Sequence, residues 1–180
     1  MKNAYRKILW SLLAFALTGA GALLYGEEGR PKEDAGRASI DRAVEREMAD
    51  QARGALLQKI YGPVQALVEK GDLPTAIFKL DELMRSYPAE AHGFILKGEL
   101  LYRMGALEES LATLVQGVRL NGEYLEQKSP LSRRALIEKV AQEGLSSVGA
   151  KVRAHPENVS AARSLKDVNY LRSRLAGGCE

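Results

Sequence analysis

Two stretches of the chain repeat one pattern of residues at an offset of 34 positions. EKGDLPTAIFKL spans residues 69–80 and RMGALEESLATL spans residues 103–114. In each, a glycine is followed by apolar and small residues at the spacing of one helix face, and the matched pairs are Gly71 with Gly105, Leu73 with Leu107, Ala76 with Ser110, and Leu80 with Leu114. A fixed period of this length is typical of stacked helical hairpins.

The repeated spacing has a physical explanation at each position. A glycine lets the first helix of a hairpin end in the left-handed conformation. A small residue in the second helix allows the first helix to approach closely, and a larger apolar residue fills the space behind it. A third unit keeps only part of the pattern: Lys139 stands where the turn glycine is expected, and the small, apolar, apolar order remains in Gly144, Leu145 and Val148.

This 34-residue pattern resembles the tetratricopeptide repeat (TPR) family. The residues that carry the resemblance are Gly98, Gly105, Ser110 and Leu114 in the second unit and Gly71, Ala76, Leu80 and Pro88 in the first. The first unit departs from the family, because Tyr61-Gly62-Pro63 replaces its signature tryptophan and Leu-Gly pair. The resemblance implies an all-α, short TPR-like solenoid with repeats at about 57–90, 91–124 and 125–158, and a capping helix at 159–176.

Helix signals in the sequence give boundaries for these units. We expect helices at about 64–70, 74–86, 90–104, 107–120, 130–149 and 157–175. Before them, residues 27–38 read as a polar linker, and Ser39 is expected to cap a helix with a weak apolar stripe of Ile40, Ala43, Val44 and Met48. Gly62-Pro63 should interrupt that helix, because proline lacks an amide donor and clashes with the preceding turn. The helical domain therefore covers 39–176, followed by a tail at 177–180.

The N-terminal segment, residues 1–26, predicts a membrane anchor. Residues 8–26 carry no charge, which approaches the ~20 apolar residues that a transmembrane helix needs. Basic residues precede this run, so we expect a single-pass helix with a cytoplasmic N-terminus and a periplasmic body in a bacterial inner membrane. The alternative is a cleaved signal peptide and a soluble periplasmic protein. A weak small-residue stripe at Ala14, Thr18 and Ala22 also fits helix pairing into a homo-oligomer.

The charge balance argues against nucleic acid as a partner. The chain has 26 Lys and Arg, and three of them lie in residues 1–26, which leaves 23 to face all 23 Asp and Glu. The body is therefore not a basic polyelectrolyte. Within it, residues 27–127 carry 13 basic and 18 acidic groups, and residues 128–180 carry 10 and 5. Such a dipolar body suits docking onto a charged protein, or the two parts are simply differently charged solvated surfaces.

No constellation for catalysis stands out in the sequence. His92 and His155 are the only histidines, and neither has a His or Cys partner at the helical spacing of a metal site. Glu108 and Glu109 start a helix, where acids offset the macrodipole. The single cysteine, Cys179, excludes an internal disulfide. We therefore expect no enzyme activity, no metal, no cofactor and no small-molecule substrate.

The TPR resemblance also implies where a partner would bind. The first helix of each unit would turn its inner face toward a concave groove, and some of the same side chains could instead pack between helices. The expected groove residues are Tyr61, Gln65, Val68, His92, Ile95, Glu99, Tyr102 and Arg133, with Tyr170 continuing the path on the cap. The sequence thus favours a non-catalytic scaffold for another envelope protein, or a constitutive accessory subunit of a larger membrane complex.

Overall fold

The described part of the chain consists of helices joined by short turns. The structure is a computed structural model that describes the backbone of residues 31–177 and the side chains from Ser39 to Gly177. It contains α2 (Pro31–Glu69), α3 (Leu73–Ser86), α4 (Ala91–Arg103), α5 (Leu107–Leu120), a 3-10 helix η1 (Gly122–Leu125), α6 (Arg134–Ala154) and α7 (Val159–Leu175). Residues 31–177 include no strand, which confirms the all-α class.

Two predicted features lie outside the described residues: the apolar segment 8–26, with its stripe at Ala14, Thr18 and Ala22, and the terminal Cys179. Among the helices from Pro31 onward, none combines the length and the apolar character needed to cross a membrane. The chain divides into two units, Met1–Asp50 and Gln51–Glu180.

Helix α2 corrects two sequence-based expectations. It begins at Pro31, so the second part of the expected linker is helical and Ser39 lies inside the helix. Proline fits the first turn of a helix, where its missing amide is not needed. The helix also continues through Pro63. Its neighbours Tyr61 and Val64 are fully buried, and this packing holds the backbone helical across the proline.

The two hairpin turns that the 34-residue pattern predicted are confirmed. Gly71 and Gly105 both have a φ of 81°, in the left-handed region that glycine adopts without a steric penalty. The hydrogen bonds around them match as well. Asp72 N donates to Leu67 O at 3.0 Å, and Ala106 N donates to Leu101 O at 2.9 Å. Each turn therefore ends its helix with the 6→1 bond of the Schellman motif.

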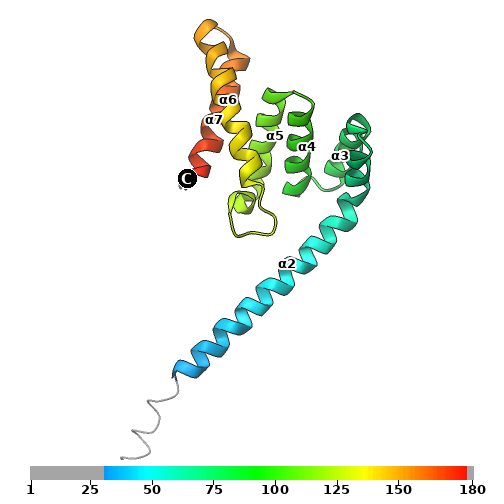
Figure 1. The fold of residues 1–180 in the computed structure, drawn as a ribbon, viewed down its shortest axis with the longest axis vertical. Helices are drawn as coiled ribbons and strands as arrows, with labels where there is room; N and C mark the ends of the chain where they lie inside the picture. Colours follow the sequence, from blue (N-terminus) through cyan, green and yellow to red (C-terminus); the bar gives the residue numbers. More distant parts are fainter. Residues whose placement is uncertain (1–30, 178–180) are drawn as a thin grey trace, which may run out of the picture. The chain divides into compact units, whose positions relative to one another are not determined.

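Small residues between α4 and α5 have the role expected of them. Ser110 is fully buried, and its hydroxyl donates to Gly98 O at 2.7 Å. A Cβ added to Gly98 would lie 2.6 Å from Leu114 Cγ. Close approach of the two helices thus depends on Gly98, while Leu114 fills the adjoining space. In Figure 1, α3, α4, α5, α6 and α7 lie next to one another in chain order.

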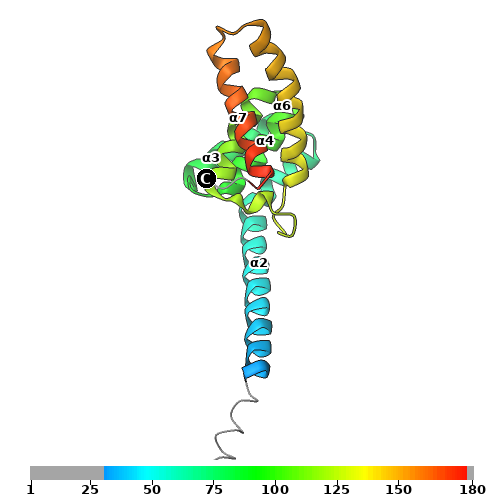
Figure 2. The ribbon, with the colours of Figure 1, turned by 90° about the vertical axis from the view of Figure 1, so that its left-hand side faces the viewer.

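The third unit does not follow the 34-residue period. Lys139 stands where the period would place a turn, and the chain is helical there, as the predicted helix at 130–149 requires; α6 runs without a break to Ala154, and its turn to α7 follows at His155. Lys139 is flanked by good helix formers and by no stop signal. Gly144 instead provides close packing, since an added Cβ would lie 2.8 Å from Val168 and 2.9 Å from Leu111. The expected cap is therefore the second arm of a long α6–α7 hairpin (Figure 2).

An irregular segment connects α5 to this hairpin and is fixed by Arg134. The Arg134 guanidinium donates to Leu125 O at 3.1 Å and to Leu175 O at 2.6 Å. It thereby joins the end of η1 to the last turn of α7. Asn121 caps η1 by accepting a bond from Glu123 N at 2.9 Å.

Candidate functional site

A groove lies between the last turns of α2 and the facing side of α4. We call it the α2–α4 groove. It encloses about 320 Å³. Its lining residues are Val64, Gln65, Val68 and Glu69 from α2, Leu96, Glu99, Leu100 and Arg103 from α4, and Arg133 from the turn before α6.

The groove has an apolar floor and a charged rim. Val64 and Leu100 are buried at its base. At the rim, Arg103 Nη2 donates to Glu99 Oε1 at 2.7 Å, and Arg133 Nε lies 4.0 Å from Glu99 Oε2. The Glu99 carboxylate thus holds two cations at one side of the groove. This arrangement suits an apolar side chain of a bound segment, with polar contacts from the same segment to the rim.

Four of the nine predicted groove residues line this groove: Gln65, Val68, Glu99 and Arg133. The prediction missed Val64 and Glu69 of α2, and it also missed three residues of α4, which are Leu96, Leu100 and Arg103. Their i, i+4 and i+7 spacing, which also includes Glu99 at i+3, marks one face of α4 and was present in the sequence.

Three other predicted groove residues belong to the core. Tyr61 and Ile95 have no exposed surface, and His92 is 6% exposed. The Tyr61 and His92 rings are 4.9 Å apart, and His92 Nδ1 lies 2.9 Å from the Tyr124 hydroxyl. Placing these three on an open groove was wrong, because they are packed between helices and are not accessible to a partner.

The buried His92 has a strongly perturbed pKa. Burial, followed by the positive charges of Arg133 and Arg53, lowers the pKa of His92 from 6.5 to about 4. The imidazole is therefore neutral at pH 7 and shares a hydrogen bond with the phenol of Tyr124. Burial also raises the pKa of Tyr61 to about 12. We interpret this ring cluster as a structural element, because its groups are enclosed by the protein.

Tyr102 and Tyr170 lie away from the lining of the α2–α4 groove. The Tyr102 hydroxyl donates to Glu143 Oε2 at 2.6 Å, and this bond is the main cause of its raised pKa. The Tyr170 ring lies 4.9 Å from the guanidinium carbon of Arg119. Both tyrosines thus connect neighbouring helices. The nine predicted residues therefore do not form one continuous groove.

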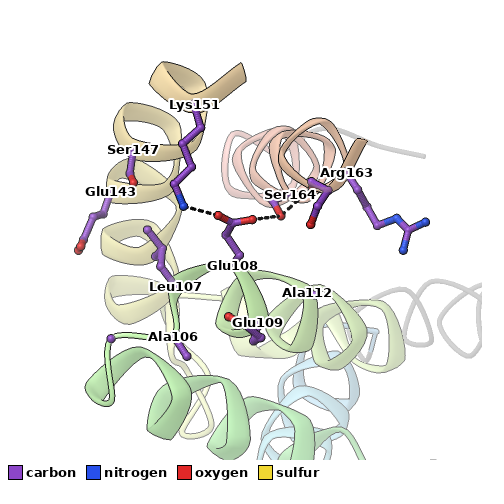
Figure 3. A pocket seen from close by; sticks show the side chains of 12 residues that line it. Ala106, Leu107, Glu108, Glu109, Ala112, Glu143, Ser147, Lys151, Arg163 and Ser164 are labelled. Atoms are coloured by element: carbon purple, nitrogen blue, oxygen red, sulfur yellow. Dashed lines mark hydrogen bonds and ion pairs between the residues drawn. The ribbon is translucent and has the colours of Figure 1, made fainter. Parts of the chain in front are cut away.

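A second, polar cleft of about 670 Å³ lies where α5 meets α6 and α7. Figure 3 shows Glu108 between Lys151 and Ser164 in this cleft. Lys151 Nζ donates to one oxygen at 2.6 Å and Ser164 Oγ to the other at 3.1 Å. The bond from Lys151 is the largest cause of the lowered pKa of Glu108. Since these contacts occupy both oxygens, Glu108 joins three helices and is a poor candidate for acid–base chemistry.

The described residues contain no group of three or more His, Cys, Asp or Glu side chains that could hold a metal ion. Of the two clefts described above, the α2–α4 groove combines an apolar floor with a charged rim, and we take it as the candidate site. No protein-family model matches the sequence, and no curated protein matches it either.

Proposed function

We propose that this protein is a non-catalytic scaffold whose TPR-like hairpins hold another protein in the α2–α4 groove. The observation that carries the proposal is the combination of an apolar floor with a rim of fixed charges, between the first helices of two successive hairpins. Such a groove can take up an apolar side chain of a protein segment while Arg103, Arg133 and Glu99 select its polar neighbours.

The TPR character of the fold is part of this proposal. It is supported by the equal φ of Gly71 and Gly105 and by the repeated turn hydrogen bonds. The buried Ser110 and its contact with Gly98 support it as well. The α6–α7 hairpin, with its displaced turn, would then be a divergent terminal unit that covers the array, as terminal repeats commonly do.

The proposal also includes the cellular location. Residues 8–26 would anchor the protein in a bacterial inner membrane, with the N-terminus cytoplasmic and the hairpins in the periplasm. N-terminal sequencing of the mature protein tests this part: a start at Met1 is expected, and a start at Leu23 would replace the anchor with a cleaved signal peptide.

The groove is tested by capture of partners from solubilised, cross-linked membranes. Gln65→Trp should fill the groove and Arg133→Glu should reverse the charge of its rim, so both should reduce the recovery of a specific partner at least about tenfold. Arg163→Glu, in the separate polar cleft, makes the same charge change and should leave recovery intact. Equal recovery with all three variants would remove the groove from the proposal.

A second candidate function is a constitutive accessory subunit of a membrane complex. The charge asymmetry favours it, because residues 27–127 carry a net charge of −5 and residues 128–180 a net charge of +5. A constitutive subunit should copurify with its complex at fixed stoichiometry through a large apolar interface. A scaffold should release its client when salt is raised, so washing the captured material in high salt separates the two functions.

A further inference from the structure

The first part of α2 carries a row of exposed apolar side chains. Ile40 is 62% exposed, Val44 52% and Met48 65%. They follow one another at a spacing of four residues within one continuous helix, so they share one face of α2. This face, which we call the α2 stripe, is separate from the α2–α4 groove, whose α2 residues begin at Val64.

Acidic residues border the α2 stripe on both sides. At about 100° of rotation per residue, Asp41 and Glu45 fall on one side of Val44, and Glu47 and Asp50 fall on the other. Within residues 39–50 the arginines are Arg42 and Arg46, and both lie at about 160° from Val44, on the opposite face. Residues 39–50 of α2 therefore have three zones: an apolar centre, acidic borders and a basic back.

This arrangement of charge excludes two partners. A second copy of the stripe would place acid against acid on both borders, in either the parallel or the antiparallel orientation, and like charges at a helix interface repel. An anionic membrane surface would be repelled for the same reason, since helices that lie on such membranes carry Lys and Arg beside their apolar face.

We propose that the α2 stripe is a docking face for a partner helix whose apolar residues are bordered by Lys and Arg. Such a helix buries its apolar residues against Ile40, Val44 and Met48. Its cations lie beside Asp41 and Glu45 on one border and beside Asp50 on the other. Because the borders of the stripe are acidic, it binds a basic amphipathic helix in preference to an acidic one of equal hydrophobicity.

The test uses the full chain and two synthetic helical peptides. Both peptides have the same leucine stripe, and its borders carry lysine in one and glutamate in the other. We expect saturable binding of the lysine peptide in a fluorescence anisotropy titration, at least about tenfold weaker binding of the glutamate peptide, and a loss of this difference as salt is raised to about 1 M.

Matched variants locate the binding on the stripe. Val44→Asp places a charge in its centre and should reduce binding of the lysine peptide at least about tenfold, while Ala49→Asp places the same charge on the basic back and should have little effect. The double variant Asp41→Lys, Glu45→Lys should transfer the preference to the glutamate peptide. Circular dichroism establishes that each variant retains its helix. Arg133→Glu lies in the α2–α4 groove and should not alter peptide binding, so the stripe proposal and the groove proposal can fail independently.

Each of several results would overturn the proposal. Equal affinity for the two peptides at low salt would show that the acidic borders do not select the partner. Equal effects of Val44→Asp and Ala49→Asp would move the contact away from the stripe. Self-association of the full chain that Val44→Asp abolishes, or adsorption to vesicles of anionic lipid that it abolishes, would assign the stripe to one of the two excluded partners.

Discussion

Acid should destabilise the helical body through His92. The imidazole is enclosed by Tyr61 and Tyr124, receives the electrostatic influence of Arg133 and Arg53, and has a pKa lowered to about 4. In the unfolded chain its pKa returns to about 6.5. Between these two values the unfolded state binds more protons than the folded state, so stability falls as the pH falls.

The size of the effect follows from the two pKa values. The difference between 6.5 and about 4, at about 1.4 kcal/mol per pH unit, corresponds to about 3 kcal/mol of unfolding free energy. The contribution is complete above pH 6.5 and is lost by pH 4. At pH 5 about 2 kcal/mol of it should already be gone. Such a loss is a large part of the 5–15 kcal/mol that typically stabilises a domain.

Urea denaturation followed by circular dichroism measures this effect. The wild-type protein, His92→Gln and His155→Gln should be unfolded at pH 7 and pH 5. Glutamine cannot take up the proton, so the His92→Gln variant should lose about 2 kcal/mol less between the two pH values than the wild type. His155 is exposed, and His155→Gln should keep the wild-type loss.

The carboxylates titrate over part of the same range, but they are present in all three proteins and cancel in the comparison. If the His92→Gln variant lost as much stability as the wild type, the interpretation of His92 as a buried neutral group would be wrong. The same conclusion would follow from an NMR titration in which the His92 ring of the folded protein titrated near pH 6.5.

Three further substitutions test the packing of the hairpins. Gly105→Ala should cost about 1 kcal/mol in urea denaturation, because alanine is strained at a φ of 81°; an unchanged midpoint would contradict the turn geometry. Gly98→Ala should cost about 1–3 kcal/mol in the same assay, because the added Cβ would lie 2.6 Å from Leu114 Cγ; a stabilised variant would contradict the close approach of α4 and α5. Glu108→Gln should lower the thermal midpoint only slightly and mainly at low salt, since its ion pair with Lys151 is partly exposed; a large, salt-independent loss would contradict this view.

The repeat could be predicted from the sequence because its turns depend on local chemistry. Gly71 and Gly105 end their helices through their own backbone conformation, which does not depend on distant contacts. In both cases the next helix begins two residues later, at Leu73 and at Leu107. The continuation of α2 through Pro63 could not be predicted in the same way. Burial of Tyr61 and Val64 on either side of the proline outweighs the local penalty, and that burial depends on α3 and α4.

The site was predicted only in part for a related reason. In a row of packed helices, each helix has apolar residues on the sides that face its neighbours as well as on any side that faces a ligand. Periodicity therefore does not distinguish Ile95, which is fully buried, from Leu96, which lines the groove. The charged and amide side chains Gln65, Glu99 and Arg133 were better guides than the aromatic ones, because they require solvent or a polar partner.

The equal geometry of the turns at Gly71 and Gly105 has a consequence for how the protein can be lengthened. An additional 34-residue unit placed before Ala91 could use the same glycine turn that the first two hairpins share. After α5 this modularity stops, because the chain passes through η1 and Arg134 bonds to both Leu125 and Leu175. A unit inserted ahead of α4 would repeat the glycine turn, but it would also separate Tyr61 of α2 from His92 and Tyr124, so lengthening the array would cost the ring cluster that joins the first hairpin to η1.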